Sequence, residues 1–283
     1  MPYFPASWLK VSGEDSAAYL QGQMARDLAK VGPDGHYTVI LDHKGKIQAD
    51  AFVGRDGEGF WVGSYFVPAA ELRARLEAFV VADDVVVDDA TETVAGFSVL
   101  GNGSRPELDE ARSALGLPGA VFRGRRIADE NWDWIVLRDR RDDALQWFLE
   151  RGARVLGVEE VQRRRILGGI PAVPDDAGKG DLPQETRLSD AAVSYDKGCY
   201  VGQEIMSRLK TRGRVRRQLR RIHGTGEPPP AHTAVLSAET KVGETRSAVR
   251  DGSGFIGWAL ITGDGADLSL GGEVRREIAL TGE

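Results

Sequence analysis

The sequence has 283 residues, of which 41% are hydrophobic and 28% are charged. This composition is typical of a soluble globular protein and excludes collagenous, coiled-coil and wholly disordered chains. The formal net charge of -6 gives no overall attraction to nucleic acid or to an anionic membrane, so any such binding must come from a local patch. Cys199 is the only cysteine, which excludes an intramolecular disulfide and a cluster held by four thiolates of this chain.

The first ten residues lack the features of a secretory signal. They have neither a basic start nor the apolar stretch of about 7 to 15 residues that such a signal requires. The apolar runs of the chain are also far shorter than the roughly 20 residues of a membrane span. We therefore expect a cytoplasmic protein with no membrane partner.

Short helices and strands alternate over the first hundred residues. An apolar stripe after Gly13 predicts a helix that carries Ala17, Leu20, Met24 and Leu28. Asp15 or Ser16 can cap this helix. Strands are predicted at 36–42, 47–53 and 60–64, a second helix from Pro68, and further strands at 85–87 and 94–100.

The pattern continues to residue 152 with a helix at 107–115, strands at 120–127 and 132–137, and a helix at 142–150. Strands therefore arrive in hairpins and small groups, which favours an α+β fold over a doubly wound sheet. Residues 170–197 show no sustained period and predict a long irregular loop, a type that is often functional or disordered. Residues 224–232 predict a stiff, proline-rich linker, and the rest predicts short strands with glycine-rich turns.

Two other patterns do not indicate a site. The stretch 252–257 matches a dinucleotide-binding fingerprint in its letters, but it leaves too little chain for a βαβ unit, so we interpret it as a turn between strands. The four histidines have no metal-ligand spacing, and we predict no metal site.

The most informative stretch surrounds the cysteine. Gly202 can cap a helix whose first turn carries Glu204, and Gly198 lets the backbone approach a ligand closely. A thiol at a helix entrance and near a lysine ammonium has a stabilised thiolate, although a buried, inert cysteine is the alternative. The motif reads Lys197-Gly198-Cys199-Tyr200-Val201-Gly202-Gln203-Glu204.

A basic strip follows the motif at 208–221 and contains no acidic residue. It suits phosphate, a polycarboxylate tail or an RNA backbone, and the alternative is a solvated surface. Its basic residues are Arg208, Lys210, Arg212, Arg214, Arg216, Arg217, Arg220 and Arg221.

The cysteine motif resembles the signature of the folate-binding YgfZ family, relatives of the glycine-cleavage T-protein. Residues 11–15, 19–23 and 41–46 resemble the first helix and hairpin of that family, and 168–171, 182–186 and 208–213 resemble the approach to and exit from the signature. Residues 242–249 resemble its closing barrel. A cysteine at position 199 favours the YgfZ branch over a true aminomethyltransferase.

This resemblance implies a three-domain, cloverleaf-like α+β architecture of the type seen in GcvT, the T-protein. Two domains would hold antiparallel sheets with helices, and the third would be a small C-terminal β-barrel. We expect residues 1–90 with 155–223 to form the folate-binding domain region, 91–154 the second α+β domain, and 224–283 the barrel.

The implied function is a tetrahydrofolate-binding accessory protein for iron–sulfur cluster assembly or repair and for iron–sulfur-dependent tRNA modification. The ligand would be tetrahydrofolate or a one-carbon derivative, and the partners would include iron–sulfur enzymes or assembly factors. Contact with tRNA is a weaker expectation. Cys199 would act as a redox-active or cluster-contacting thiol beside the folate.

The resemblance and the chemistry of a pterin together indicate binding residues. Glu185 is placed to accept hydrogen bonds from the amide and amino edge of the pterin, and Arg208 or a neighbour in the basic strip to pair with the glutamyl tail. Tyr200 and Met24 are predicted walls of the ring site, with core packing as the alternative for both.

Two rival functions stay open at this point. The first is an aminomethyltransferase or other one-carbon transferase, in which Asp50 would manage the proton on the reacting nitrogen. Asp50 lies near a folate-contacting aspartate of the T-protein, although Ala49 interrupts the acidic pair usual there. The second is an RNA-binding module that uses residues 208–221. Whether the chain is an enzyme therefore depends on Asp50 and Cys199.

Overall fold

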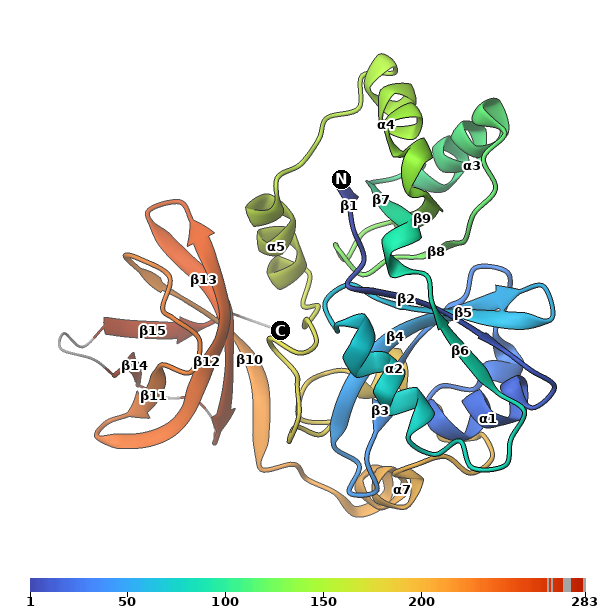
Figure 1. The fold of residues 1–283 in the computed structure, drawn as a ribbon. Helices are drawn as coiled ribbons and strands as arrows, with labels where there is room; N and C mark the ends of the chain where they lie inside the picture. Colours follow the sequence, from blue (N-terminus) through green and yellow to red (C-terminus); the bar gives the residue numbers. More distant parts are fainter. Residues whose placement is uncertain (264, 266, 272–275, 282–283) are drawn as a thin grey trace.

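The computed structural model describes residues 1–263, 265, 267–271 and 276–281, with the backbone alone for Arg212. Figure 1 shows three groups of elements: a five-stranded sheet with helices, a four-stranded sheet with helices, and a closed six-stranded barrel. Paired strands run antiparallel in each group. The predicted α+β fold with a C-terminal β-barrel is confirmed.

The five-stranded sheet carries the predicted cysteine site on its helix-covered side. Its strand order is β3-β4-β5-β2-β6, and Leu20, Leu72 and Ile47 are among the fully buried side chains of its core. The elements are β2 (Ser7–Ser12), α1 (Ser16–Gln23), η1 (Leu28–Lys30), β3 (His36–Leu41), β4 (Ile47–Asp56), β5 (Gly59–Ser64), α2 (Ala69–Glu77) and β6 (Val86–Asp89).

Helix α1 is shorter than its apolar stripe predicts. Met24 is already extended, bridges to Ile40, and donates its N–H to Leu20 as the helix ends. The next residues follow β3, because Ala25 N–H donates to the Val39 carbonyl and Arg26 N–H to Thr38 Oγ1. Met24 and Leu28 are therefore buried as predicted, but from outside the helix.

The second sheet has the order β1-β7-β9-β8 and two helices on one face. Helix α3 ends, as predicted, before Gly116, which adopts the left-handed conformation at φ 60°. The elements of this second group are β1 (Pro2–Tyr3), η2 (Thr91–Thr93), β7 (Val94–Leu100), α3 (Ser104–Leu115), β8 (Val121–Arg123), β9 (Asn131–Leu137), η3 (Arg138–Arg140) and α4 (Arg141–Glu150).

The two sheets face each other through an aromatic core. Trp8 stacks on Trp61 with ring centroids 4.8 Å apart, and Phe122 of the second sheet lies 5.2 Å from the Trp61 ring. Large aromatic side chains bury much apolar area each, so this contact holds the two sheets together.

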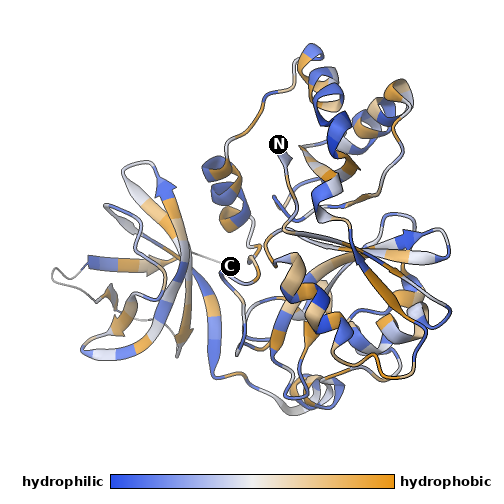
Figure 2. Cartoon of the chain, in the orientation of Figure 1, coloured by the Kyte–Doolittle hydropathy of each residue, from blue (hydrophilic) through white to orange (hydrophobic). Residues whose placement is uncertain are grey.

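Helix α5 (Val158–Leu167) is absent from our sequence-based expectations. Its residues are mostly charged or polar, and Figure 2 shows a largely hydrophilic helix. Its buried apolar side chains are only Val161 and Ile166, a stripe too narrow to stand out. Ile166 packs against Trp258 and Leu219 on the outer wall of the barrel.

The barrel closes in the order β10-β13-β12-β11-β14-β15. The predicted linker at 224–232 is shorter than expected, because Gly224 and Thr225 still pair with β13. Residues 252–257 form the predicted turn and the start of a strand. The barrel strands are β10 (Arg217–Thr225), β11 (Ala234–Ser237), β12 (Thr240–Asp251), β13 (Gly254–Thr262), β14 (Leu268–Leu270) and β15 (Arg276–Leu280).

The domain boundaries stay a proposal. Strand β10 begins at Arg217, ahead of the boundary at 224, and β1 pairs with β7 of the second sheet. Within the predicted barrel region, positions 264, 266, 272–275 and 282–283 lie outside the described residues.

The predicted loop at 170–197 is mostly irregular but well packed. It contains the one-turn helix α6 (Ser189–Ala192), and Val173, Leu188 and Val193 are buried in the core of the five-stranded sheet. The chain then enters α7 (Gln203–Arg212) at the lower edge of Figure 1. The loop therefore delivers the cysteine motif to a fixed position.

Candidate functional site

The motif begins a helix as the sequence predicts. Gly202 is the residue before α7 and has φ +87°, a conformation that strongly favours glycine. A Cβ there would lie 2.7 Å from the Asp42 carbonyl oxygen. The start of α7 therefore lies directly against the turn between β3 and β4, and only glycine allows this approach.

The same turn needs a second glycine. Gly45 has φ +73°, and a Cβ there would lie 2.6 Å from Met206 Cε of α7. The carboxylate of Asp42 closes the turn by accepting hydrogen bonds from the N–H groups of Lys44 and Lys46. In contrast, a Cβ at Gly198 would meet no atom within 4 Å among the described residues.

Lys197 anchors the motif to the end of α1. Its ammonium donates to three backbone carbonyls, those of Gln21, Met24 and Arg26, at 2.6, 2.7 and 3.1 Å. Carbonyls at a helix end carry partial negative charge, which favours a cation there. Burial nevertheless lowers the pKa of Lys197 to about 8, with Asp27 opposing the shift. The ammonium is thus occupied by carbonyls, and its predicted effect on the thiol stays a proposal.

Two further motif residues hold the loop that carries the cysteine. Gln203 donates from Nε2 to the Lys197 carbonyl, and Val201 N–H donates to the Gly22 carbonyl. Tyr200 is buried in the core of the five-stranded sheet, with Lys197 Nζ 5.1 Å from its ring centroid. Its hydroxyl has no hydrogen-bond partner among the described residues, and burial raises its pKa.

Cys199 is exposed and lines a cavity of about 720 Å³. The cavity is formed by the motif, the β3–β4 hairpin and the end of α2. The motif supplies Cys199, Tyr200, Val201, Gly202, Gln203 and Glu204, the hairpin Asp42, His43 and Gln48, and the end of α2 Arg75, Ala78 and Phe79.

The wall from α2 is both cationic and apolar. Arg75 donates to the Leu41 carbonyl at 2.9 Å and to Gln23 Oε1 at 3.1 Å. Its guanidinium carbon lies 4.9 Å from the ring centroid of Phe79, which is 51% exposed. Burial lowers the pKa of Arg75. Sequence reasoning did not single out this pair, because nothing in the helix pattern separates it from an ordinary surface.

Glu185 lies on the other side of the β3–β4 turn. Arg217 of β10 donates to both of its oxygens, from Nε at 3.1 Å and from Nη2 at 2.8 Å, and Leu182 N–H donates to Oε2 at 2.9 Å. Burial alone would raise the pKa of Glu185, but the hydrogen bonds from Arg217 and Leu182 hold it below its usual value.

A network of charges surrounds Glu185. Lys46 Nζ is 4.0 Å from Glu185 Oε2, and Asp181 accepts from Arg217 at 3.2 Å and from Arg246 of β12 at 3.4 Å. This network joins the loop at 178–185 to the barrel. Arg217 belongs to the predicted basic strip, but no sequence signal distinguishes it from its neighbours.

Asp50 is buried in β4, away from bulk water. Ser64 donates to its Oδ1 at 2.7 Å, and the Tyr37 hydroxyl donates to its Oδ2 at 2.9 Å. Burial raises the pKa of Asp50 to about 6, against the opposing effect of these hydrogen bonds. The guanidinium of Arg125 stacks over the Tyr37 ring at 4.1 Å. Asp50 is thus a carboxyl that changes its protonation near neutral pH.

Met24 and Arg208 occupy opposite environments. The Met24 side chain is fully buried in the core of the five-stranded sheet, whereas Arg208 is exposed and paired with Glu204 one helical turn away. Elsewhere in the basic strip, Arg217 is bound to Glu185 and Arg221 to the Leu167 carbonyl. The side chain of Arg212 lies outside the description. Exposed cations of the strip include Arg208, Lys210, Arg214 and Arg216.

The structure thus brings motif residues 199–204 together around one cavity, but it does not gather all the predicted residues there. Lys197, Asp50, Glu185, Met24 and Arg208 are not among the described residues that line the Cys199 cavity. The β3–β4 turn connects the two parts, since Asp42 faces the cavity and Lys46 faces Glu185.

The described part of the chain contains no group of three or more His, Cys, Asp or Glu side chains placed to hold a metal ion. Of the helices in the same part, none has the length and apolar character needed to span a membrane.

Comparison with known proteins identifies relatives over most of the chain. The tRNA-modifying protein YgfZ of Escherichia coli O157:H7 is 30% identical over 247 residues, which cover 83% of this chain and 74% of that protein. The tRNA-modifying protein YgfZ of Cronobacter sakazakii is 29% identical over 240 residues, covering 78% and 69%. No family model matches the sequence.

Among solved structures, the glycine cleavage system aminomethyltransferase T from Bartonella henselae matches with a TM-score of 0.81. The match covers 99% of this chain and 84% of that one, at 16% sequence identity. It shows that the two chains share a GcvT-like fold.

Proposed function

The chain belongs to the YgfZ family, and we propose that it is a cytoplasmic tetrahydrofolate-binding accessory protein for iron–sulfur cluster assembly or repair and for iron–sulfur-dependent tRNA modification. In this proposal Cys199 acts as a redox-active or cluster-contacting thiol. The observation that carries it is the exposure of Cys199 on a cavity of about 720 Å³ formed by its own motif, the β3–β4 hairpin and the end of α2.

The position of the thiol suits contact with another molecule. A thiol sealed in a core would be inert, whereas this one is exposed. The loop that carries it is fixed by the Lys197 ammonium and by Gly202 at the entrance of α7. Preorganisation of this kind lowers the entropy that a partner must lose when it binds the thiol.

In this proposal, Glu185 and its neighbours would accept hydrogen bonds from one edge of a reduced pterin. A carboxylate has about four acceptor positions, and Glu185 uses three of them for Arg217 and Leu182. It can therefore take one further N–H donor as it stands, and a second only if Arg217 releases an oxygen. Gln184, the preceding residue, has a buried Oε1 with no partner among the described residues. These acceptors support a ligand rich in N–H donors.

The acidic tail of folate calls for cations near the same region. Arg217 is only half-buried and lies at the Glu185 carboxylate, so it is the member of the basic strip that could exchange from a protein carboxylate to a ligand carboxylate. Arg208 is the exposed alternative. Met24, predicted as a wall of the pterin site, offers no surface to a ligand, because its side chain is fully buried. The folate itself would supply a carrier for a one-carbon unit.

Calorimetric titration with tetrahydrofolate under reducing, anaerobic conditions tests the binding proposal. We expect the wild type to bind and Glu185→Gln to bind at least tenfold more weakly, a loss of about 1.4 kcal/mol typical of a hydrogen bond to a charged group. Glu159→Gln, at an exposed position of α5, is the matched control. Absence of wild-type binding would refute the folate assignment, and equal affinity in Glu185→Gln would refute the role of Glu185.

Asp50 favours a second candidate, a folate-dependent one-carbon transferase. Its pKa of about 6 allows it to hold or release a proton near neutral pH, as a general acid or base must. The test is turnover with a carrier loaded with an aminomethyl group. Release of methylene-tetrahydrofolate by the wild type, and its loss in Asp50→Asn, would establish this function, whereas no turnover by the wild type excludes it.

A further inference from the structure

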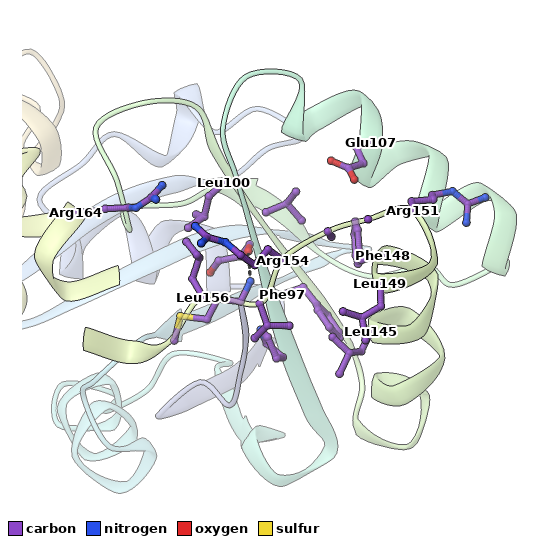
Figure 3. A pocket seen from close by; sticks show the side chains of 17 residues that line it. Phe97, Leu100, Glu107, Leu145, Phe148, Leu149, Arg151, Arg154, Leu156 and Arg164 are labelled. Atoms are coloured by element: carbon purple, nitrogen blue, oxygen red, sulfur yellow. Dashed lines mark hydrogen bonds between the residues drawn. The ribbon is translucent and has the colours of Figure 1, made fainter. Parts of the chain in front are cut away.

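A second cavity, of about 380 Å³, lies between the four-stranded sheet and α5 (Figure 3). Its walls are β7, the side of α4, the connector at 151–156, the chain start at 1–2, Glu107 of α3 and Arg164 of α5. Cys199, Asp50 and Glu185 do not line it. The cavity is therefore separate from the residues of the proposed function, and its size is at the lower end of the range for small-molecule sites.

The floor of this cavity is apolar. Phe97 of β7 and Phe148 of α4 lie with ring centroids 6.1 Å apart and belong to the core of the second sheet. Leu145 and Leu149 extend this surface along α4 in Figure 3, and Leu149 is 42% exposed. Phe97 and Phe148 are only 2% and 5% exposed, so a ligand placed here would bury apolar surface mainly of Leu145 and Leu149, which lie on that fixed core.

The mouth of the cavity is cationic. Arg154 is exposed and makes no hydrogen bond or ion pair within the described residues, whereas Arg164 pairs with Glu160 at 2.7 Å. Figure 3 shows the side chains of Arg154 and Arg164 pointing toward one another across the opening. Glu107 is the only acidic side chain among the described residues of the lining. Glu160 offsets part of the repulsion between the two guanidinium groups, because it pairs with Arg164 and also interacts electrostatically with Arg154. Arg154 itself has no hydrogen bond within the described residues that it would lose on pairing with an incoming anion.

Arg151 has a different part. Its guanidinium carbon lies 3.9 Å from the Trp147 ring centroid, and its Nε is 3.8 Å from Glu110 Oε1. It therefore supports α4 and adds positive potential, but it is held away from a ligand. Arg154 is the cation best able to pair with an incoming anion.

We propose that this cavity binds an amphipathic monocarboxylate, with its apolar body on Leu145 and Leu149 and its carboxylate at Arg154. Arginine matches a carboxylate with two parallel N–H donors, and the apolar floor excludes small polar anions as preferred ligands. The cavity volume accommodates a chain of about eight carbons.

The test is calorimetric or NMR titration of the full chain with octanoate, compared with acetate and with 1-octanol. We expect octanoate to bind at least tenfold more tightly than either comparator, because only octanoate offers both parts. Equal affinity for octanol would overturn the proposed role of the arginine, and equal affinity for acetate would overturn that of the floor. No saturable octanoate binding would overturn the proposal as a whole.

Variants locate the binding. Arg154→Ala removes an exposed side chain that has no partner within the described residues, so we expect a folded protein that binds octanoate about tenfold more weakly. Leu149→Asp places a negative charge on the floor and should abolish binding. Arg123→Ala, an exposed arginine of β8 outside the cavity, should bind like the wild type. Unchanged binding in Arg154→Ala, or equal loss in Arg123→Ala, would contradict the assignment.

Discussion

The buried carboxyl of Asp50 gives a prediction whose size follows from the structure. Its pKa is about 6 in the folded chain, against a reference value of 3.8. The folded state therefore holds the proton more tightly than the unfolded state, and stability falls as pH rises from about 3.8 to 6. One pKa unit corresponds to about 1.4 kcal/mol, so the full difference is about 3 kcal/mol.

Asp50→Asn removes this titration while keeping the shape of the side chain. We expect the free energy of unfolding of the variant to rise relative to the wild type by about 2 kcal/mol between about pH 4.5 and about pH 7.5. Denaturant unfolding of both proteins across this range measures the difference at each pH. Asp139→Asn, at an exposed position, is the control for loss of one charge.

A flat difference between Asp50→Asn and the wild type would refute the reasoning. So would a difference of opposite sign, in which the variant becomes relatively less stable as pH rises. A flat difference would mean that the hydrogen bonds from Ser64 and Tyr37 balance burial at Asp50, and a difference of opposite sign would mean that they outweigh it.

Three further variants test the architecture of the site. Gly202→Ala should lower the free energy of unfolding by about 2 kcal/mol or more, because at φ +87° the added Cβ meets the Asp42 carbonyl. Gly198→Ala, the control, should change it by less than about 0.5 kcal/mol. Equal effects of the two variants in denaturant unfolding would contradict the packing of α7 on the β3–β4 turn. Lys197→Met should lose stability relative to the wild type as pH rises from about 8 to 10.5. The lowered pKa of Lys197 makes the folded wild type release its proton at a lower pH than the unfolded chain, so the wild type gains stability over that range. A stability difference that stays constant with pH would refute this. Arg217→Gln should destabilise the chain by about 1–3 kcal/mol, because the Glu185 carboxylate stays buried with fewer hydrogen-bond donors. The double variant Arg217→Gln with Glu185→Gln should recover stability, and no recovery would contradict that cause.

Elements with a clear period or a clear end could be predicted from the sequence. Strand β7 spans the predicted residues, and α3 ends before Gly116 as predicted. The entrance of α7 was also predictable, because glycine at 202 and an acid at 204 form a recognisable start. Local chemistry decided these positions, so distant contacts were not needed.

Elements that depend on distant contacts could not be predicted in the same way. The end of α1 is set by the pairing of Met24 with Ile40, which overrides an apolar stripe that continues to Leu28. Helix α5 has few buried apolar residues, and its place depends on Trp258 of the barrel. Neither contact leaves a pattern in the local sequence.

The candidate site shows the same division. The signature identified Cys199 and its neighbours, which gather at one cavity. The partners of the charged residues were not predictable: Lys197 binds carbonyls at and just after the end of α1, and Glu185 binds Arg217 across the junction with the barrel. Such pairs depend on how distant parts of the chain pack together, and a single sequence does not show which residues this packing brings into contact.

The most direct test of the proposed function compares Cys199→Ser with the wild type, each expressed in cells that lack the chromosomal gene for this protein. Mass spectrometry of bulk tRNA would measure the nucleosides made by iron–sulfur enzymes, and calorimetry on the purified variant would measure tetrahydrofolate binding. We predict that Cys199→Ser binds tetrahydrofolate like the wild type but fails to restore those nucleosides. Full restoration by Cys199→Ser would contradict the role of the thiol.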